Sequence, residues 1–324
     1  MIPTEVPFDN IVRFGQQTMI NNPLFSVSWI LGRFCNYKCS YCWPYARSDK
    51  IDHLPLEVYK SAIDEIKKQA KANGFNQFHW SMSGGEPTAY KHLLDLIEHI
   101  NFGQDTYQSI HMTTNLSPGK EWWKNWCNKS STLCRRSITA SYHEEFANES
   151  DFGNKCLQLM DQNVFVTINQ VMVPERFYEL YDRCYRFYNM GINVTLKPQS
   201  DPTASKVVSG YNDDMIHIMQ TGFPQQFAGE EIHQVVLYDD NNNEYLFDQA
   251  ERFNAFGFNK FKSWSCNSGY QSVIIRGNEV KRGYSCHDTP LGTLTEGFDI
   301  FNSPQRCITP SCISSADSKI PKCK

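Results

Sequence analysis

Three cysteines within eight residues are the strongest chemical signal in the sequence. Cys35, Cys39 and Cys42 are spaced C-x3-C-x2-C and follow the apolar stretch 25–31. Three thiolates from one short loop can hold three corners of a cubane iron-sulfur cluster, whereas complete ligation takes four, so one iron would stay open for chemistry. Zinc also binds cysteines, usually through paired C-x2-C units or with histidines that complete a set of four. No second C-x2-C unit lies nearby, which favours the open cluster.

A second motif, Gly84-Gly85-Glu86-Pro87, follows a predicted strand that ends at Met82. Two glycines allow the backbone to approach a ligand closely, and the Glu86 carboxylate can accept hydrogen bonds from an ammonium group. A Gly-Gly pair alone is equally typical of an ordinary strand-to-helix turn. The motif lies one strand-helix unit after the cysteine triplet, and the two motifs in this order rarely occur together by chance.

Together the two motifs resemble those of the radical S-adenosylmethionine (SAM) superfamily, whose signature has an aromatic residue, here Tyr41, before the third cysteine. The resemblance implies that Cys35, Cys39 and Cys42 hold a [4Fe-4S] cluster and that its open iron chelates SAM. It also implies that the glycine motif lies against the SAM amino group and that Tyr41 packs on the adenine. Cleavage of SAM would yield a 5'-deoxyadenosyl radical that abstracts hydrogen from a substrate. The residues that these two implied SAM contacts involve are Tyr41, Gly84, Gly85, Glu86 and Pro87.

Polar residues at later strand ends extend this resemblance. Thr114 and Asn115 are similar to the T-N segment of the family. Ser141 and Asn169 are candidates for the ribose or carboxylate of SAM, and Met172 is a candidate neighbour of the adenine. Each of these residues is also compatible with a simple role at the end of a strand.

The segment Ser141-Tyr142-His143-Glu144-Glu145 offers candidate catalytic groups. A histidine beside a carboxylate at a strand end can serve as a general base, so His143 and Glu144 are the predicted catalytic residues. The alternative is that both are solvated loop side chains.

Apolar periodicity predicts alternating strands and helices before residue 200. We expect strands at 25–31, 77–82, 109–113, 137–141, 164–173 and 192–196, and helices at 55–73, 90–100, 120–129, 149–162 and 175–190. Parallel strands need crossover connections, so this order predicts an α/β fold with a parallel sheet and helices outside it. Six units are too few for a closed eight-stranded barrel. The expected fold is therefore a partial (β/α)6 TIM-like barrel, with the cysteine loop at the carboxyl ends of its strands.

The C-terminal region carries a second set of cysteines. Cys266, Cys286, Cys307 and Cys312 are separated by 20, 21 and 5 positions, and four thiolates can ligate one more metal centre fully. The region resembles the Twitch or SPASM extensions of the superfamily, and the missing SPASM run favours a Twitch-like module with one auxiliary [4Fe-4S] cluster. A structural zinc is the alternative. Cys323 is an alternative fourth ligand.

These patterns divide the chain into four parts. We expect an N-terminal extension (1–24), the radical SAM partial barrel (25–205), a connecting or substrate-covering segment (206–262) and a small cysteine-rich auxiliary-cluster domain (263–324). Hairpins are predicted at 235–247 and 273–280 from apolar runs that flank turn residues.

Composition limits the possible partners and location. The 324 residues are 40% hydrophobic, which is enough for a full core, and the formal net charge of -4 gives no case for binding nucleic acid or an anionic membrane. The sequence has no apolar run long enough to span a bilayer, and residues 1–5 lack the order of a signal peptide. We therefore expect a cytoplasmic protein. In that reducing compartment, 12 cysteines favour metal or radical chemistry over disulfides.

The expected function is that of a radical SAM oxidoreductase or epimerase acting on a polar small molecule such as a sugar, an aminocyclitol or a related metabolite. An auxiliary cluster that accepts an electron would give oxidation, whereas a cysteine that donates hydrogen would give epimerisation. An electron donor such as flavodoxin or ferredoxin is implied. One alternative is a peptide maturase, although only 34 residues precede Cys35 to form a leader-binding domain. Another is a non-catalytic iron-sulfur or zinc-binding protein, which would not need the glycine motif.

Overall fold

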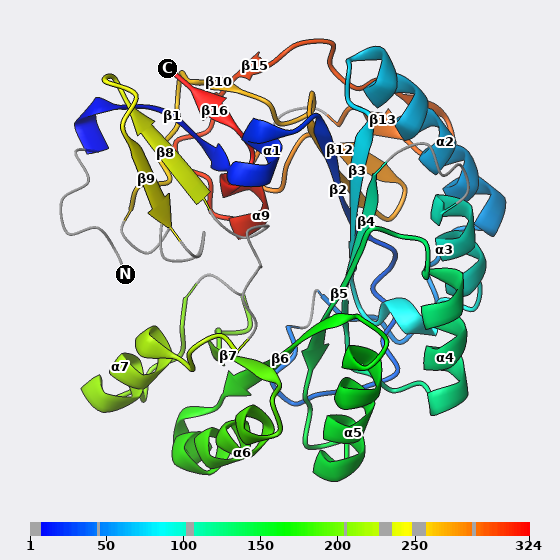
Figure 1. The fold of residues 1–324 in the computed structure, drawn as a ribbon, viewed down its shortest axis with the longest axis vertical. Helices are drawn as coiled ribbons and strands as arrows, with labels where there is room; N and C mark the ends of the chain where they lie inside the picture. Colours follow the sequence, from blue (N-terminus) through cyan, green and yellow to red (C-terminus); the bar gives the residue numbers. More distant parts are fainter. Residues whose placement is uncertain are drawn as a thin grey trace.

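The computed structural model describes residues 8–43, 46–101, 107–203, 206–226, 235–247, 257–286 and 290–324. These residues form two β-sheets, of which the larger has ten strands and is covered by helices on its outer side (Figure 1). Six neighbouring strands of the larger sheet are parallel and follow chain order, as the sequence predicts. They are β2 (Leu24–Ile30), β3 (Gln77–Ser83), β4 (Gln108–Thr114), β5 (Arg135–Ser141), β6 (Phe165–Met172) and β7 (Asn193–Pro198).

The predicted helices connect these strands. They are α2 (Leu56–Ala72), α3 (Leu93–Asn101), α4 (Lys120–Lys129), α5 (Glu149–Met160) and α6 (Phe177–Asn189), with the 3-10 turns η2 (Pro87–Ala89) and η3 (Pro174–Arg176) before α3 and α6. After β7 comes α7 (Asp213–Thr221). The sheet curves without closing on itself, so the prediction of a partial, open TIM-like barrel is confirmed (Figure 1).

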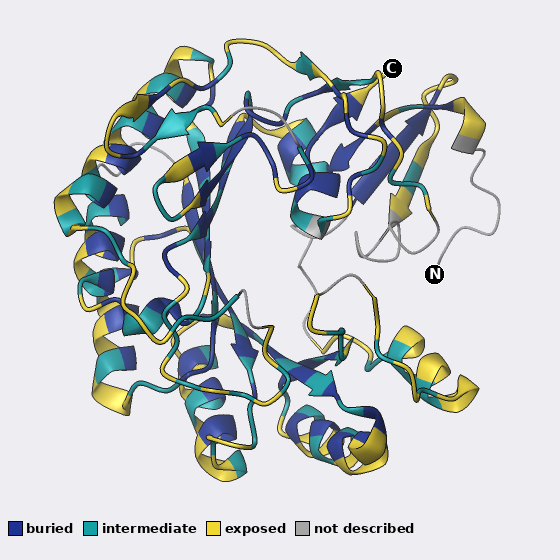
Figure 2. Cartoon of the chain, turned by 180° about the vertical axis from the view of Figure 1, so that it is seen from behind, coloured by how far each residue is buried: buried dark blue, intermediate teal, exposed yellow. Residues whose placement is uncertain are grey.

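Helix α2 illustrates how the sequence sets these elements. Tyr59, Ile63, Ile66 and Ala70 recur at helical spacing and are all buried against the sheet. The helix ends before Gly74, whose φ of 87° suits a residue without a side chain. The same arrangement recurs around the barrel: the helix faces toward the sheet are buried and the opposite faces are exposed (Figure 2).

The parallel strands have one apolar and one polar face. In β3, Phe78, Trp80 and Met82 are buried among the helices, while His79 and Ser81 point to the inside of the barrel. Parallel strands buried on both faces usually read as continuous apolar runs. The alternation here therefore marks a polar space inside the barrel.

A C-terminal segment extends this sheet beyond β2. Strand β11 (Ser272–Arg276) pairs with β2 in parallel, and it forms the predicted hairpin with β12 (Glu279–Lys281). Two short strands follow at this edge: β13 (Gly292–Thr293) pairs antiparallel with β12, and β14 (Gly297–Phe298) pairs antiparallel with β13. Residues far apart in the sequence thus build one continuous wall.

The second sheet has six antiparallel strands in the order β15-β10-β16-β1-β8-β9. Its strands are β1 (Ile11–Gln16), β8 (Val235–Asp239), β9 (Glu244–Phe247), β10 (Ser265–Cys266), β15 (Gln305–Arg306) and β16 (Lys322–Cys323). β8 and β9 are the predicted hairpin. Two short helices, η1 (Phe8–Asn10) and α1 (Gln17–Asn21), flank β1, and α9 (Ser315–Ser318) precedes β16.

These sheets cross the predicted domain boundaries. β1 from the N-terminal extension pairs with β8 from the connecting segment and β16 from the auxiliary region, while β11 pairs with the barrel strand β2. Residues 1–7, 227–234 and 248–256 of the predicted segments lie outside the described residues. The division into four parts stays a prediction.

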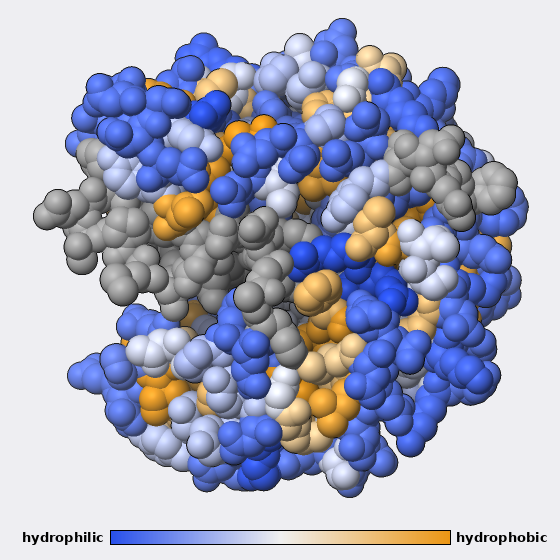
Figure 3. Space-filling view, in the orientation of Figure 1, coloured by the Kyte–Doolittle hydropathy of each residue, from blue (hydrophilic) through white to orange (hydrophobic). Residues whose placement is uncertain are grey.

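The outer surface is mainly hydrophilic on the face seen in Figure 3, where apolar atoms form separate patches. Among the residues that the structure describes, no helix has the length and apolar character needed to cross a membrane.

Candidate functional site

The predicted cluster-binding loop follows β2, at the carboxyl end of the parallel strands. Burial raises the pKa of Cys35, Cys39 and Cys42, and it lifts that of Cys39 to about 12 with contributions from Glu145 and the other two thiols. The three thiols are therefore close enough to influence one another. Because they are protonated near pH 7, binding of a metal centre must release their protons.

Two carboxylates that the sequence analysis missed hold this loop in place. Asp52 accepts hydrogen bonds from the backbone N of Arg33 (2.9 Å) and of Phe34 (3.1 Å) at the start of the loop. Glu145 accepts from the backbone N of Ser40 (3.0 Å) and from its hydroxyl (2.9 Å), between the second and third cysteines. Glu145 is distant from the cysteines in sequence and Asp52 lies beyond the loop, so no motif identifies either carboxylate.

The glycine motif packs against the cysteine loop itself. A Cβ on Gly85 would lie 2.2 Å from the carbonyl oxygen of Phe34, and one on Gly84 would lie 2.3 Å from that of Gly32. The backbone N of Glu86 donates to the Phe34 carbonyl (2.9 Å). The glycines were expected to admit a ligand, but the close approach seen here is to protein backbone. Their place beside the cluster loop agrees with the pairing of the two motifs.

Glu86 is the centre of a buried network, with 2% of its surface exposed. Its Oε1 accepts from the hydroxyls of Thr88 and Thr114 (2.7 Å each), and its Oε2 accepts from the backbone N of Asn115 (2.7 Å). Burial raises the pKa of Glu86, and these hydrogen bonds oppose the rise. Asn115 in turn donates to Asn36 in the cysteine loop (3.0 Å). The predicted residues Glu86, Thr114 and Asn115 are thus brought together, and a SAM contact by Glu86 stays a prediction.

Tyr41 and His143 form a pair beside the cysteines. The Tyr41 hydroxyl lies 2.7 Å from His143 Nδ1, and their ring centroids are 5.8 Å apart. Burial lowers the pKa of His143 to about 4, although Glu145 opposes the shift. The imidazole is therefore neutral at physiological pH. It keeps Nε2 for a second partner, as a general base or donor requires.

Glu144 is engaged elsewhere. Its carboxylate is paired with the guanidinium groups of Arg176 and Arg183, and Arg176 Nη2 lies 3.0 Å from Oε2. These ion pairs tie the end of β5 to η3 and to α6. His143 and Glu144 were predicted as a catalytic pair, but the geometry gives them different partners. We therefore regard Glu144 as a positioning residue.

The remaining predicted SAM contacts divide between the two faces of β6. Ser141 of β5 and Asn169 of β6 are register partners, and Asn169 lines the barrel interior. Met172 lies on the opposite face, fully buried in the core beneath the helices. The Met172 side chain therefore faces the helices, because residues separated by an odd number of positions in a strand face opposite ways. A place for Met172 near the adenine stays a prediction.

A polar cavity of about 460 Å³ fills the barrel interior. Its wall is built in rows across the sheet: Ser26, His79, Ser109 and Arg135 are partners in one row, and Ser28, Ser81, His111 and Ser137 form the next. Hydrogen bonds of 2.9 Å join His79 to Ser109 and His111 to Ser137. These rows were not predicted, although the alternation of apolar and polar residues in each strand was a signal for them.

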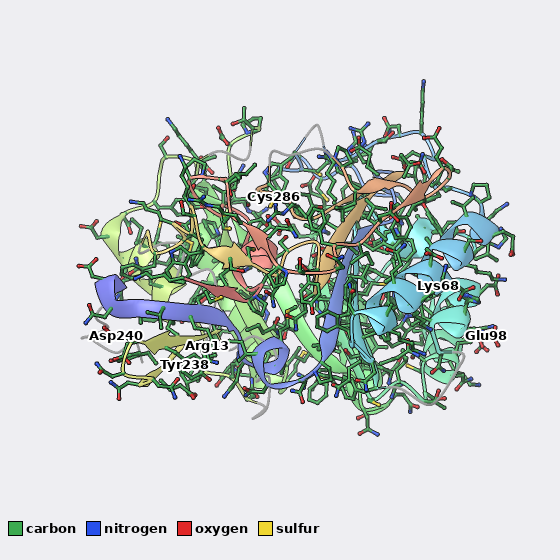
Figure 4. The ribbon with its side chains drawn as sticks, turned by 90° about the horizontal axis from the view of Figure 1, so that it is seen from above. Arg13, Lys68, Glu98, Tyr238, Asp240 and Cys286 are labelled. Atoms are coloured by element: carbon green, nitrogen blue, oxygen red, sulfur yellow. The ribbon has the colours of Figure 1, made fainter. Side chains whose placement is uncertain are left out.

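The four predicted auxiliary ligands also meet. Cys266, Cys286, Cys307 and Cys312 line one small cavity beside the second sheet. In Figure 4, Cys286 lies between Arg13 and Tyr238 of the second sheet on one side and Lys68 of α2 on the other. Three of the four thiols are at most 5% exposed, in a cluster with Phe14 and Phe261. Burial raises the pKa of Cys312 to about 11, while Lys322 opposes the rise.

Cys323 does not share this cavity. On the paired strands β10 and β16, Cys266 lies opposite Lys322, whereas Cys323 lies opposite Ser265. Neighbouring residues of a strand point to opposite faces, so Cys323 is turned away from Cys266, and it is exposed. Cys312 is the fourth ligand that the geometry favours.

Both sets of thiols suit an iron-sulfur centre chemically. Backbone N atoms approach the sulfurs of Cys35 (3.4 Å from Tyr37) and Cys266 (3.5 Å from Ser268), as expected of thiolate ligands. As they stand, no three His, Cys, Asp or Glu side chains in the described part of the chain converge to hold a single metal ion. The case for an iron-sulfur centre at each site therefore depends on how the thiols are grouped there.

Arg282 and Asp317 connect the two cavities. Both line the barrel interior and the four-cysteine cavity. The Asp317 carboxylate accepts from the backbone N atoms of Tyr284 (3.1 Å) and Ser285, which precede Cys286. The auxiliary site therefore shares a wall with the space above the parallel strands.

Comparisons with known proteins agree with this geometry. The sequence profile of the Radical SAM superfamily matches residues 29–130. Among solved structures, native anSMEcpe with bound AdoMet has a TM-score of 0.54 at 14% identity, covering 85% of this chain and 79% of the other. The same protein with bound AdoMet and Cp18Cys peptide gives 0.50 at 13% identity over the same shares. No curated protein matches the chain. The similarity of the structures shows the fold, and the profile falls on the cysteine and glycine motifs.

The superfamily implies an enzyme that binds a [4Fe-4S] cluster and SAM and needs a reductant and a substrate. The cysteine-rich C-terminal region fits an auxiliary cluster. Residues 29–130, from β2 to the end of α4, thus match the radical SAM superfamily.

Proposed function

We propose that this enzyme oxidises a polar small molecule bound in the barrel cavity. The supporting observation is the wall of Arg282 and Asp317 that the barrel cavity shares with the four-cysteine site. A substrate in the barrel would lie next to a centre able to accept an electron. That arrangement favours net oxidation of the substrate.

The proposed ligand sets follow from the grouping of the thiols. Cys35, Cys39 and Cys42 would hold the SAM-binding cluster, and the four C-terminal cysteines would hold the auxiliary cluster. When bound, SAM and its cluster supply a 5'-deoxyadenosyl radical. The protein would position the substrate. In the tautomer whose Nδ1–H donates to the Tyr41 hydroxyl, His143 would offer Nε2 to the proton that oxidation releases.

The lining of the cavity supports a hydroxylated substrate, such as a sugar or an aminocyclitol. Serine, threonine, asparagine and histidine side chains dominate the inner face of the strands. The hydroxyl of Ser272 is buried, 4% exposed, and has no hydrogen-bond partner within the described part of the chain. A buried hydroxyl of this kind gains most from a polar ligand. In Figure 3, strongly hydrophilic side chains also gather near the middle of the visible face.

The positions of the remaining thiols support oxidation over epimerisation. Epimerisation needs a hydrogen donor, commonly a thiol, beside the substrate. Cys127, Cys156 and Cys184 are at most 5% exposed and belong to the core beneath the helices. No cysteine lines the barrel cavity among the described residues, which include all 12 of the chain.

A peptide substrate is the second candidate. It is favoured by the structural similarity to anSMEcpe, which binds a Cp18Cys peptide in one of its structures. The identity of 13% leaves this likeness at the level of the fold. A non-catalytic metal-binding role is the third candidate, with zinc as the alternative metal at the C-terminal site.

The test is anaerobic reconstitution with iron and sulfide, followed by assays of SAM cleavage with a reductant such as reduced flavodoxin or ferredoxin. Candidate polyols, aminocyclitols and peptides are compared by mass spectrometry. A product lighter by two hydrogens supports oxidation, and an unchanged mass with deuterium taken from heavy water indicates epimerisation. If only the peptides were converted, the substrate class would be a peptide and not a polar small molecule. Absence of 5'-deoxyadenosine with both centres loaded would overturn the proposal.

A further inference from the structure

A buried lysine lies at the wall of the auxiliary site. Lys322 is 2% exposed and lines the cavity of the four cysteines. Its Nζ donates to the carbonyl oxygens of Asp317 (2.8 Å) and Ile320 (2.7 Å) and lies 4.8 Å from the ring centroid of Phe261. Within the described part of the chain, no carboxylate forms an ion pair with it.

This environment leaves the charge of Lys322 incompletely balanced. Moving an ammonium group out of water costs several kcal/mol unless an opposite charge compensates for it. Carbonyl dipoles and aromatic rings provide part of that compensation. The nearest acidic group on the cavity wall, Asp317, directs its carboxylate to the backbone N atoms of Tyr284 and Ser285. Arg282, on the same wall, adds a second positive charge.

Ligation would supply the missing negative charge. The thiols are neutral while protonated, but four thiolates around an iron-sulfur centre give the site a net negative charge. Addition of one electron makes that charge one unit more negative. A cation fixed in a water-excluded wall stabilises the more negative form more strongly than an exposed cation does.

We propose that Lys322 is the counter-ion of the auxiliary centre and raises its reduction potential. The inference depends on the proposed function, because it takes Cys266, Cys286, Cys307 and Cys312 as the ligands. In catalysis, a higher potential favours transfer of one electron from the substrate radical to the centre, while the radical loses one proton and becomes the oxidised product. Lys322 is thus a positioning residue for charge and does not touch the substrate.

The chain provides a matched control two positions away. Lys324 is exposed, donates to the carbonyl oxygen of Asp9 (2.9 Å) and lies 5.5 Å from the Trp264 ring. It has the same charge and a similar aromatic contact, but water can screen it. The three-cysteine loop is a second internal reference, since its neighbour Arg47 is already paired with Asp49 at 2.7 Å.

The experiment is a dithionite titration of the anaerobically reconstituted full chain, followed by electron paramagnetic resonance. Lys322→Met, Lys322→Arg and Lys324→Met are compared with the wild type. We expect Lys322→Met to lower the midpoint potential of one centre and leave the other unchanged, while both other variants titrate as the wild type does. An unshifted Lys322→Met with full iron content would overturn the inference. An equal shift in Lys322→Arg would assign the effect to packing and overturn it too.

Iron and sulfide counts cover the case in which Lys322→Met loses the centre. Loss in Lys322→Met with retention in Lys322→Arg supports the need for a charge, and loss in both contradicts it. A wrong ligand assignment would give a different result: the wild type itself would hold only one iron-sulfur centre, or zinc at the second site. That result would overturn the ligand assignment and the role of Lys322 together.

Discussion

The two cysteine sites differ in how the chain assembles them. The N-terminal site takes all its thiols from eight consecutive residues, and its loop is held by carboxylates from elsewhere in the fold, Asp52 and Glu145. The C-terminal site draws four thiols from 47 positions, and of these Cys266 lies on β10 while Cys307 directly follows β15. Exposure differs as well: Cys42 is exposed, whereas Cys266, Cys307 and Cys312 are buried.

This difference fits a division of labour. A centre with three protein ligands and an open edge can bind SAM and do chemistry. A centre with four ligands in a buried site is closed to substrates and suited to holding an electron. Arg282 and Asp317 form a wall that the four-cysteine site shares with the barrel cavity.

The largest effect is expected from Cys39→Ala. Loss of one of only three ligands should remove the N-terminal cluster and abolish formation of 5'-deoxyadenosine, because no fourth protein ligand can substitute. Iron content should fall by one centre, and the C-terminal centre should remain. Cys134→Ala removes an exposed cysteine outside both sites and should change neither quantity. Retained cleavage of SAM by Cys39→Ala would contradict the assignment of the loop.

A smaller but still severe effect is expected from Gly85→Ala. Its Cβ would lie 2.2 and 2.3 Å from the carbonyl oxygens of Phe34 and Arg33, so the cysteine loop must shift. Forced overpacking of this kind costs about 1–3 kcal/mol. SAM affinity and iron at the N-terminal site should fall, as measured by calorimetry and iron counts. Gly119→Ala meets nothing within 4 Å and is the control. Equal losses at both sites would show that the glycine supports the whole fold.

Much of this architecture could be predicted from local patterns. The strand-helix repeats, the cysteine triplet and the glycine motif each lie within a short stretch, and periodicity or spacing determines their form. The four C-terminal cysteines that share one cavity could also be named, because cysteine is chemically distinct. By contrast, Asp52 and Glu145 act through contacts with residues 19 and 105 positions away. Acidic residues are common in proteins, so the presence of an aspartate or glutamate does not by itself reveal such a role.

The missed features share a dependence on strand pairing. The rows of His79 and His111 exist because parallel strands align in a specific register, which spacing alone does not give. The orientation of Met172 has the same origin: its side chain faces the helices because of its parity in β6. Glu144 looked catalytic beside His143, but two arginines of η3 and α6 bind it. Adjacent residues in sequence therefore took unrelated roles.

A moderate effect is expected from His143→Gln. If the neutral imidazole accepts the substrate proton, product formation should fall by about 10²-fold while SAM cleavage without substrate persists. Burial holds the pKa of His143 near 4, below its usual value of 6.5. The wild-type rate should therefore stay level from pH 8 to pH 6 and fall only as the pH approaches 4. The stability that this histidine contributes is complete above pH 6.5 and is lost as the pH falls toward 4. A rate that titrates near pH 6.5 would contradict this assignment.

The smallest effect should come from Cys323→Ser, and it defines the limits of the C-terminal site. Cys323 faces away from Cys266 across the pair of β10 and β16, so its loss should leave iron and sulfide counts unchanged. Cys312→Ser should remove the auxiliary centre, because its buried thiol lines the same cavity as the other three. The two variants make the same chemical change in the same short region. If Cys323→Ser lost iron and Cys312→Ser retained it, Cys323 would be the fourth ligand in place of Cys312. The C-terminal site would then not be closed and buried, because Cys323 is exposed.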